Sequence, residues 1–230
     1  MVIPFRLLLC ASTVVTISCA QPDAASDRPP APATQRAVQT AKPASVPRVV
    51  FLGDSLTAGY GLAREQSVPS LIQARLNSAG YRYEVVNAGV SGDTSAGGLS
   101  RLDWSLDGDV DVLVIELGAN DGLRGLPATE LKRNLSEIIT RAKKRGITVI
   151  LTGMEAPPNY GAAYTSEFRQ VFRDVAREHK VALVPFYLEG VAGNPSLNIS
   201  DGIHPNPAGA RIVEQTIWRA LEPVLDKSDR

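Results

Sequence analysis

The stretch FLGDSLTAGYG, residues 51 to 61, contains two side chains that could take part in chemistry. Asp54 and Ser55 follow an apolar run that ends at Gly53, and two further glycines, Gly59 and Gly61, come shortly after them. A serine hydroxyl becomes an effective nucleophile when a neighbouring base accepts its proton. The chain contains only two histidines, at positions 179 and 204. We therefore ask which of these imidazoles could serve Ser55.

The two histidines lie at opposite ends of the predicted elements. His179, in VAREHKVAL, ends a predicted helix and precedes a strand, where a cation interacts favourably with the helix dipole. We expect His179 to be structural. His204, in SDGIHPN, lies in the last loop before the final predicted helix, and Pro205 and Pro207 restrict its backbone. We expect His204 to be the base.

An acidic residue three positions before His204 is placed to orient it. The carboxylate of Asp201 can reach the imidazole Nδ1–H, fix its tautomer and stabilise the imidazolium. The alternative is that Asp201 caps a turn or helix, and we favour the first interpretation. Asp54 is a poorer candidate because the side chains of adjacent residues diverge, and we expect it to bond backbone in its own loop.

Attack on an acyl carbon also needs hydrogen-bond donors for the oxyanion. Ser55 N–H should lie at the start of a helix, where free N–H groups favour negative charge. Gly92, in GVSGDTS, offers a second N–H because glycine lets the chain approach closely. Asn120, in GAND, offers its side-chain amide, although an isolated Asn there is more often a turn residue. Three neighbours are expected to shape these loops: Gly89, Gly118 and Asp121.

The elements that must position these residues alternate along the chain. Five short, β-branched and nearly continuous apolar runs predict buried strands at residues 48–52, 83–88, 111–117, 147–153 and 181–186. Helical spacing of apolar residues predicts helices at 67–80, 128–146, 164–180 and 207–225, with Gly80 as a stop signal. The helix at 128–146 carries one apolar face: Leu131, Leu135, Ile138, Ile139 and Ala142.

Alternating strands and helices predict one α/β domain at residues 48–226, with helices on both sides of a five-stranded parallel sheet in a three-layer α/β/α arrangement; the family resemblance described below implies that this sheet is flavodoxin-like. In such sheets the ligand site lies at the carboxyl ends of the strands. The loops that follow the predicted strands include all the candidate residues named above. The sequence therefore predicts that the chemistry occurs at this edge.

Four blocks of the sequence resemble those of the SGNH, or GDSL, hydrolases. They are GDSL after the first predicted strand, Gly92 in SGDTS, Asn120 in GAND, and Asp201 with His204 in DGIHP. All four occur in order, and the resemblance covers residues 48–225. The phrases NAGVSGDTS, ELGANDGLRG and PPNYG are especially similar to the bacterial periplasmic thioesterase I group of esterases, arylesterases and lysophospholipases.

The resemblance implies a function and a role for each block. Ser55 would be the nucleophile, Asp201 and His204 would complete a triad, and Gly92 and Asn120 would join Ser55 N–H in the oxyanion hole. The activity would be hydrolysis of acyl esters and thioesters through an acyl-enzyme intermediate, with no metal or organic cofactor. The loops at 154–164 and 122–126 are expected to border the acyl pocket. No protein partner is predicted.

Three alternative functions can be compared with this sequence. Carbohydrate O-deacetylation is an activity of the same family. A nucleotide- or flavin-binding module would need a phosphate loop, and GDSLTAGYG has neither the lysine of a P-loop nor the G-x-G-x-x-G pattern. A scaffold without activity would not need Ser55, Asn120, Asp201 and His204 together. Lys plus Arg equals Asp plus Glu at 24 each, and without a run of like charge nucleic acid is not expected as a partner.

The first 47 residues have a different composition from the predicted domain. Residues 1–19, with Arg6 before a short apolar stretch, predict a signal peptide, and the Pro- and Ala-rich residues 20–47 predict a disordered tether. Both cysteines, Cys10 and Cys19, lie in this leader. The TISC sequence resembles a lipoprotein cleavage box, with Thr16 where Leu is commonest. Either Cys19 is lipidated and attaches the protein to a membrane, or cleavage near Ala20 discards it, and both outcomes predict export to the periplasm.

Overall fold

Five short apolar segments form one parallel sheet in the computed structural model, which describes residues 46–225. The strands are Arg48–Gly53 (β1), Glu84–Gly89 (β2), Val110–Glu116 (β3), Thr148–Thr152 (β4) and Ala182–Val184 (β5). Their order, β2-β1-β3-β4-β5, is that of a flavodoxin-like sheet. The predicted fold class is confirmed. The largest difference in a strand boundary is at β5, which was predicted to end at residue 186 and ends at Val184.

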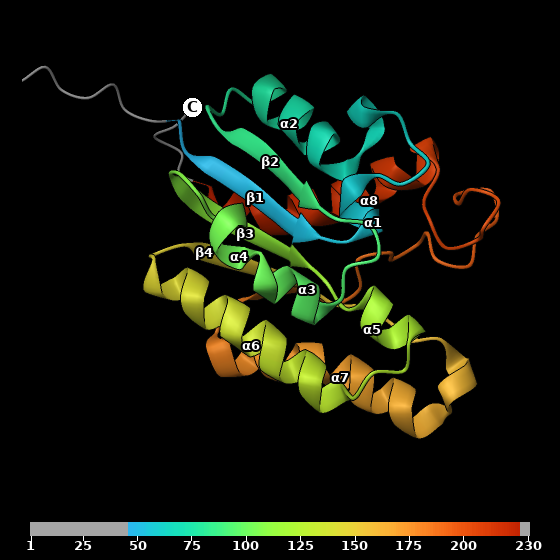
Figure 1. Ribbon diagram of the computed structural model, residues 1–230. Helices are drawn as coiled ribbons and strands as arrows, with labels where there is room; N and C mark the ends of the chain where they lie inside the picture. Colours follow the sequence, from blue (N-terminus) through green and yellow to red (C-terminus); the bar gives the residue numbers. More distant parts are fainter. Residues whose placement is uncertain (1–45, 226–230) are drawn as a thin grey trace, which may run out of the picture. The chain divides into compact units, whose positions relative to one another are not determined.

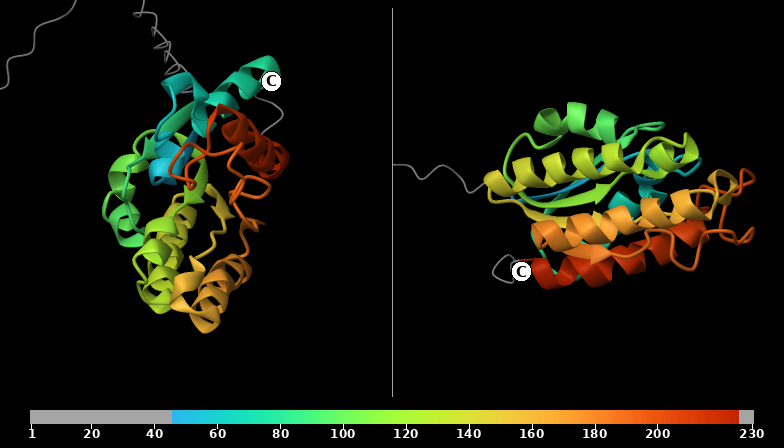
Figure 2. Two further views of the ribbon diagram at one scale, coloured as in Figure 1. Left: turned by 90° about the vertical axis from the view of Figure 1, so that its right-hand side faces the viewer. Right: turned by 90° about the horizontal axis from the view of Figure 1, so that it is seen from below.

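Four long helices cover the two faces of the sheet, and Figure 1 shows the resulting three layers. They are Val68–Ser78 (α2), Ala128–Lys144 (α6), Ala162–His179 (α7) and Pro207–Leu221 (α8). Helix α2 contacts α8 on one face, and α6 contacts α7 on the other (Figures 1 and 2). The predicted apolar face of α6 is completely buried. Burial on both faces explains why the central strands are continuously apolar.

Several short helices occur in segments that the sequence suggested to be loops. They are Ser55–Ala58 (α1), Ser95–Ser100 (α3), Leu102–Ser105 (α4) and Ala119–Leu123 (α5), with 3₁₀ turns at Arg64–Gln66, Pro158–Tyr160 and Glu222–Val224. The sequence predicted only the start of α1, after β1. Helices of four to six residues are too short to show a periodic apolar pattern.

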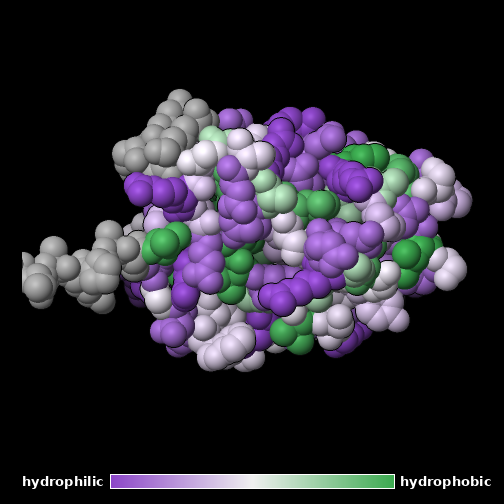
Figure 3. Space-filling model, turned by 90° about the horizontal axis from the view of Figure 1, so that it is seen from above, coloured by the Kyte–Doolittle hydropathy of each residue, from purple (hydrophilic) through white to green (hydrophobic). Residues whose placement is uncertain are grey.

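The loops at the carboxyl ends of the strands gather at one end of the sheet. Figure 2, left, looks onto this end, where segments after β1, β2, β3 and β5 come together. On the face seen in Figure 3, hydrophobic residues are scattered among hydrophilic ones. Within residues 46–225, no helix combines the length and apolar character needed to cross a membrane.

The leader and most of the tether lie outside the described residues. This applies to the signal peptide predicted at 1–19, to Cys19, and to the predicted tether apart from Val46 and Pro47. The described residues all belong to one structural unit, residues 43–230.

Candidate active site

Ser55 is the first residue of α1 and follows the end of β1 by two positions. Asp54 caps this helix, because its Oδ1 accepts a hydrogen bond from Leu56 N–H at 3.0 Å. Asp54 therefore bonds backbone in its own loop, as the sequence analysis expected. Gly59 ends the helix with a φ of 82°, a conformation that favours glycine. The turn fixes the position of the Ser55 side chain at the end of the sheet.

His204 lies on the loop between β5 and α8, in a tight turn. The Asp201 Oδ1 atom accepts hydrogen bonds from Ile203 N–H and His204 N–H, both at 3.0 Å. The His204 carbonyl accepts a further hydrogen bond from Ile199 N–H at 2.8 Å. These bonds hold the backbone on which the imidazole is carried.

The structure brings Ser55, His204 and Asp201 into one chain of hydrogen bonds. His204 Nε2 lies 2.9 Å from Ser55 Oγ, although the residues are 149 positions apart. His204 Nδ1 lies 2.6 Å from Asp201 Oδ2. Asp201 thus fills both roles considered for it, turn cap and partner of the imidazole, because Oδ1 accepts from the turn and Oδ2 faces His204.

The hydrogen bonds to Asp201 also favour its charged form. Desolvation by itself raises the pKa of Asp201, but the N–H groups of Ile203 and His204 and the imidazole outweigh it. The pKa of Asp201 is therefore below its ordinary value. The carboxylate stays ionised beside the imidazole at neutral pH.

Two of the residues predicted to stabilise an oxyanion have backbone N–H groups without a hydrogen-bond acceptor among the described residues. Ser55 and Gly92 line the same cavity, and Gly92 has a φ of 85°. Within residues 46–225, neither Ser55 N–H nor Gly92 N–H donates a hydrogen bond. The Gly92 carbonyl accepts a hydrogen bond from Arg124 Nη2 at 2.8 Å, which restricts the peptide group between Gly92 and Asp93.

Asn120 lines this cavity too, but its side chain has more contacts than the sequence suggested. Its Nδ2 donates to Asp54 Oδ2 at 3.1 Å and to the Asp93 carbonyl at 2.9 Å. An amide nitrogen has two protons, so both already have acceptors. Asn120 can serve an oxyanion only as a shared donor, and it also ties the β1 and β2 loops together.

Glu116, like Asp54, is a completely buried carboxyl group close to the turn that carries Ser55. Glu116 Oε2 accepts hydrogen bonds from Thr57 Oγ1 at 2.9 Å and from Asp54 N–H at 3.3 Å. Burial raises the pKa of Asp54 to about 6, against hydrogen bonds from Leu56 N–H and other groups that lower it. Burial and the nearby Asp54 charge raise the pKa of Glu116 well above its ordinary value. Sequence reasoning missed Glu116, although an acid ending a buried apolar strand is an available signal.

The cavity beside Ser55 has a volume of about 510 Å³ and is mostly apolar. Both loops expected to border it contribute: Leu123 from one, and Met154 to Pro157 from the other. The remaining apolar part of the lining comes mainly from the segment after β5, which the sequence did not indicate as part of the site. These residues are Leu56, Tyr60, Ala119, Phe186, Leu188, Ala192, Gly193 and Ile203.

Tyr60 packs directly against the proposed base. Its ring centroid lies 4.7 Å from that of His204, with the planes inclined by 42°. His179, in contrast, lies in the last turn of α7, where its carbonyl accepts a hydrogen bond from Lys143 Nζ at 2.6 Å. His179 is not among the described residues that line the cavity. The structure thus separates the two histidines as expected.

Comparisons with known proteins identify the family of this chain. The model of the GDSL-like Lipase/Acylhydrolase family matches residues 51–212. The chain is 42% identical to an arylesterase of Vibrio mimicus, over 76% of this chain and 88% of that protein. It is 34% identical to thioesterase 1/protease 1/lysophospholipase L1 of Escherichia coli, over 81% of this chain and 89% of that protein.

A solved structure shows the same fold. The crystal structure of TesA superimposes with a TM-score of 0.74 at 45% identity, over 78% of this chain and 99% of that chain. The family match covers most of the described residues, including Ser55, Asp201 and His204. The chain therefore belongs to the GDSL-like lipase/acylhydrolase family and is a carboxylic ester hydrolase with the SGNH hydrolase fold.

Proposed function

We propose that this esterase hydrolyses acyl esters and thioesters by acyl transfer to Ser55, with His204 as general base and Asp201 as the carboxylate that orients it. One observation carries the proposal. The hydrogen-bonded series Asp201–His204–Ser55, with distances of 2.6 and 2.9 Å, opens onto an apolar cavity of about 510 Å³. A nucleophile, a base and space for an acyl group are thereby adjacent.

In the first step, Ser55 Oγ attacks the substrate carbonyl carbon while its proton passes to His204 Nε2. A C–O bond forms and the electron pair of the carbonyl moves to its oxygen. The imidazolium that results carries its second proton on Nδ1, facing Asp201 Oδ2. The low pKa of Asp201 keeps a negative charge beside that imidazolium.

The new oxyanion would be stabilised by backbone N–H groups of residues that line the cavity. Neither Ser55 N–H nor Gly92 N–H has an acceptor among the described residues. Asn120 Nδ2 would be a third donor, shared with Asp54 and Asp93. Such fixed donors need no reorganisation during the reaction.

The tetrahedral intermediate then collapses to the acyl-enzyme. The bond to the leaving alkoxide or thiolate breaks, and His204 gives that group its proton. A water molecule attacks the acyl carbon in the second half-reaction, with the same imidazole as base, and Ser55 regains its proton when the carboxylic acid leaves. The sequence of steps uses only protein groups and water.

The proposed substrate class rests on the cavity and on the relatives. An apolar lining favours acyl chains and aromatic rings over sugars, which need hydrogen-bonding partners. The relatives named arylesterase and thioesterase 1/protease 1/lysophospholipase L1 extend the proposal to aryl esters, thioesters and lysophospholipids. The alternative within the family is O-deacetylation of carbohydrates.

Export belongs to the same proposal. Residues 1–19 would be a signal peptide, 20–47 a tether and 48–226 the catalytic domain, located in the periplasm. Lipidation of Cys19 predicts globomycin-sensitive processing and palmitate labelling that Cys19→Ser abolishes. Full recovery of the wild-type protein in an osmotic-shock fraction would instead mean cleavage without an anchor.

A substrate panel with matched variants tests the catalytic proposal. Wild type, Ser55→Ala and the surface control Ser78→Ala are compared on p-nitrophenyl esters from acetate to dodecanoate, acyl-CoA, lysophosphatidylcholine and acetylated xylose. Ser55→Ala should lose about 10⁴–10⁶-fold in kcat, and Ser78→Ala should match wild type. Equal rates for Ser55→Ala and wild type would exclude the mechanism, and a preference for acetylated xylose would favour the deacetylase.

A further inference from the structure

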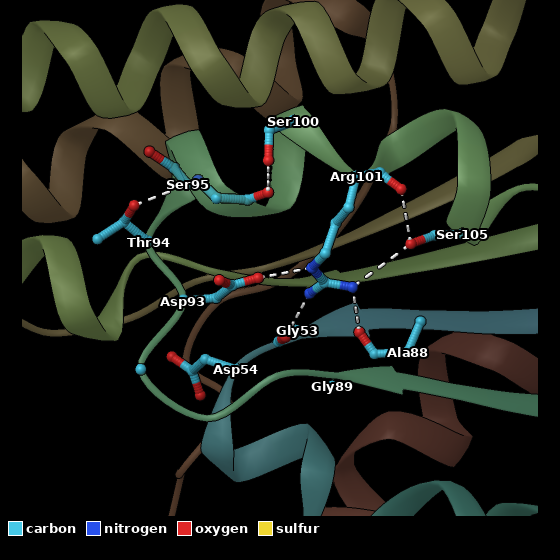
Figure 4. A network of polar contacts seen from close by, with 12 residues as sticks. Gly53, Asp54, Ala88, Gly89, Asp93, Thr94, Ser95, Ser100, Arg101 and Ser105 are labelled. Carbon is cyan, nitrogen blue, oxygen red and sulfur yellow. Dashed lines mark hydrogen bonds and ion pairs between the residues drawn. The ribbon is translucent and has the colours of Figure 1, made fainter.

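Arg101 lies between α3 and α4, where it ends the first helix and precedes the second. Its side chain is only 16% exposed, and that of its partner Asp93 is 19% exposed. Figure 4 shows the guanidinium at the centre of contacts from three segments of the chain. A cation so little exposed needs partners for its N–H groups, and their identity indicates what it holds in place.

Two of these partners are carbonyl groups at the carboxyl ends of strands. Nη2 donates to the Gly53 carbonyl at 2.8 Å, and Nη1 donates to the Ala88 carbonyl at 2.7 Å (Figure 4). Gly53 ends β1, directly before the turn that carries Ser55. The Gly53 carbonyl also accepts Val90 N–H at 3.0 Å. The guanidinium thus joins the ends of β1 and β2.

The third partner lies on the loop that offers the second oxyanion donor. Arg101 Nε donates to Asp93 Oδ2 at 2.6 Å, and Asp93 directly follows Gly92. The carbonyl of Asp93 accepts Asn120 Nδ2 at 2.9 Å. Through Asp93, one guanidinium is therefore connected to both the Gly92 peptide and the Asn120 amide.

The adjoining helix is shaped to accept this carboxylate. A Cβ atom at Gly97 in α3 would lie 2.6 Å from Asp93 Oδ1, closer than real contacts allow. Glycine at this position lets the Asp93 carboxylate approach the helix backbone. The close approach at Gly97 is an observation independent of the Arg101 hydrogen bonds, and it shows that α3 leaves room for the carboxylate in this position.

The chemistry of arginine suits this task better than that of lysine. A guanidinium is planar and presents its N–H groups at fixed angles, so three acceptors bound together are held in one geometry. Charged hydrogen bonds are also shorter and stronger than neutral ones. An ammonium group is a point charge and would fix the distances without fixing the directions.

We propose that Arg101 is the positioning residue of the oxyanion hole, holding the Ser55, Gly92 and Asn120 donors at the spacing that the tetrahedral oxyanion requires. The proposal rests on the proposed function, because it assigns a role toward the same oxyanion. Arg101 touches neither the substrate nor the reacting atoms and acts through Gly53, Ala88 and Asp93. Displacements of about 1 Å at a catalytic group can cost about 10²-fold in rate.

Kinetics per active site separate positioning from stability. Arg101→Lys and Arg101→Gln are compared with wild type and with the exposed control Arg177→Gln, after active sites are counted by titration with a p-nitrophenyl phosphonate. We expect kcat per site on p-nitrophenyl butyrate to fall about 10–100-fold in Arg101→Gln and less in Arg101→Lys. KM should change by less than about threefold, and Arg177→Gln should match wild type.

A transition-state analogue gives the second readout. An alkyl trifluoromethyl ketone forms a tetrahedral adduct with a serine, so its inhibition constant should rise in the same proportion as kcat/KM falls. A purely structural role would reduce the number of titrated sites and leave both quantities per site unchanged. Values of kcat per site within twofold of wild type in Arg101→Gln would overturn the proposal.

Two further variants make the result decisive. If Arg101→Gln does not fold, Asp93→Asn, which keeps the side-chain shape and removes the charge, is judged by the same two readouts and limits. Ser55→Ala tests the proposed function separately. An active Ser55→Ala would refute the mechanism itself, whereas an inactive Ser55→Ala with an unaffected Arg101→Gln would refute only the positioning role.

Discussion

At the scale of single residues, two completely buried carboxyl groups contact the turn that carries Ser55. Asp54 and Glu116 have no exposed surface, and the raised pKa values of both show that their environment disfavours two negative charges. Thr57 Oγ1, Asp54 N–H and Asn120 Nδ2 donate to this pair. The helix that begins with Ser55 is therefore anchored to β3 through a group that retains a proton more readily than usual.

The pair should make stability depend on pH. A carboxyl group whose pKa is raised by folding contributes stability that is present below its unfolded pKa and is lost as pH rises through the folded pKa. The free energy of unfolding of wild type should therefore fall as pH rises from about 5 to about 8. In Glu116→Gln the amide oxygen can still accept from Thr57, and one of the two buried titrating groups is removed.

The free energy of unfolding should fall less with pH in Glu116→Gln than in wild type. We expect the difference, variant minus wild type, to increase by about 1–3 kcal/mol when the pH rises from about 5 to about 8. Urea unfolding at both pH values measures this difference. The exposed acid Glu137 gives the control Glu137→Gln, for which no such change is expected. A difference between Glu116→Gln and wild type that is independent of pH would show that the buried pair does not titrate in this range.

The sequence predicted the residues whose type alone suggests chemistry. Ser55, His204 and Asp201 could be chosen because the chain has two histidines and one of them follows an acid by three positions. Glu116 and Arg101 could not be chosen in this way. Their roles depend on donors 59 to 62 positions away for Glu116 and on acceptors up to 48 positions away for Arg101, which only the folded chain brings together.

At the scale of elements, the end of β2 contacts the backbone of α1. A Cβ atom at Gly89 would lie 2.3 Å from Ala58 N and 2.8 Å from the carbonyl carbon of Thr57. Asn87 Nδ2 donates to the Thr57 carbonyl at 3.1 Å, which strengthens this contact. The helix that carries Ser55 is thus positioned by close approach of two backbones.

Gly89→Ala should therefore displace α1. The φ of Gly89 is not in the left-handed region, so crowding alone causes the effect. We expect a loss of about 1–3 kcal/mol in stability and a decrease of about tenfold or more in kcat per folded molecule. Thermal unfolding and steady-state kinetics measure the two quantities.

Gly80→Ala is the matched control for this prediction. Gly80 has a φ of 82°, and its Cβ would meet nothing within 4 Å. Alanine there should cost about 1 kcal/mol through backbone strain and leave kcat unchanged. If Gly89→Ala and Gly80→Ala lost stability and kept full activity alike, the contact with α1 would have no catalytic consequence.

The long elements could be predicted because each shows a clear period or a continuous apolar run. Helix α6 illustrates this, since its five predicted apolar positions are all buried. Helices α3, α4 and α5 could not be predicted, because they are too short to show a period and depend on contacts with other segments. Ser95, for example, donates to Asp121 through both its N–H and its hydroxyl, which joins α3 to α5.

At the scale of the whole molecule, an electrically balanced protein carries an apolar cavity at one end of its sheet. The sequence has a formal net charge of zero, so the net charge favours neither cationic nor anionic substrates. Tyr60, Leu123 and Ile203 line the cavity and are each nearly half exposed or more. Selection among substrates should therefore depend mainly on the fit of the acyl group.

Narrowing the cavity should shift the preferred chain length. Ala192 lines the cavity and is exposed, so Ala192→Trp adds an indole ring without disturbing the core. We expect the ratio of kcat/KM for p-nitrophenyl octanoate to that for acetate to fall about tenfold or more. The control Ala163→Trp, on the exposed surface of α7, should keep the wild-type ratio. An unchanged ratio in Ala192→Trp would place the acyl chain elsewhere.

The sequence predicted the fold and the edge of the sheet where the site lies, because alternating strands and helices indicate a parallel sheet and ligand sites lie at the carboxyl ends of its strands. The flavodoxin-like strand order came from the family resemblance. It predicted only part of the cavity. The segment that contributes Phe186, Leu188 and Ala192 follows a three-residue strand and shows no pattern that assigns it to the site. Its position depends on how the chain returns from β5 to His204.

The central claim is that Ser55 becomes covalently bound to substrate with the help of His204, and phosphonate labelling tests it most directly. Wild type treated with a p-nitrophenyl alkylphosphonate should gain one phosphonyl group per chain, on the peptide that contains Ser55, as measured by mass spectrometry. His204→Ala should react at least about 100-fold more slowly, and Ser55→Ala should gain no label. Labelling of another residue, or of Ser55→Ala at the wild-type rate, would contradict the account.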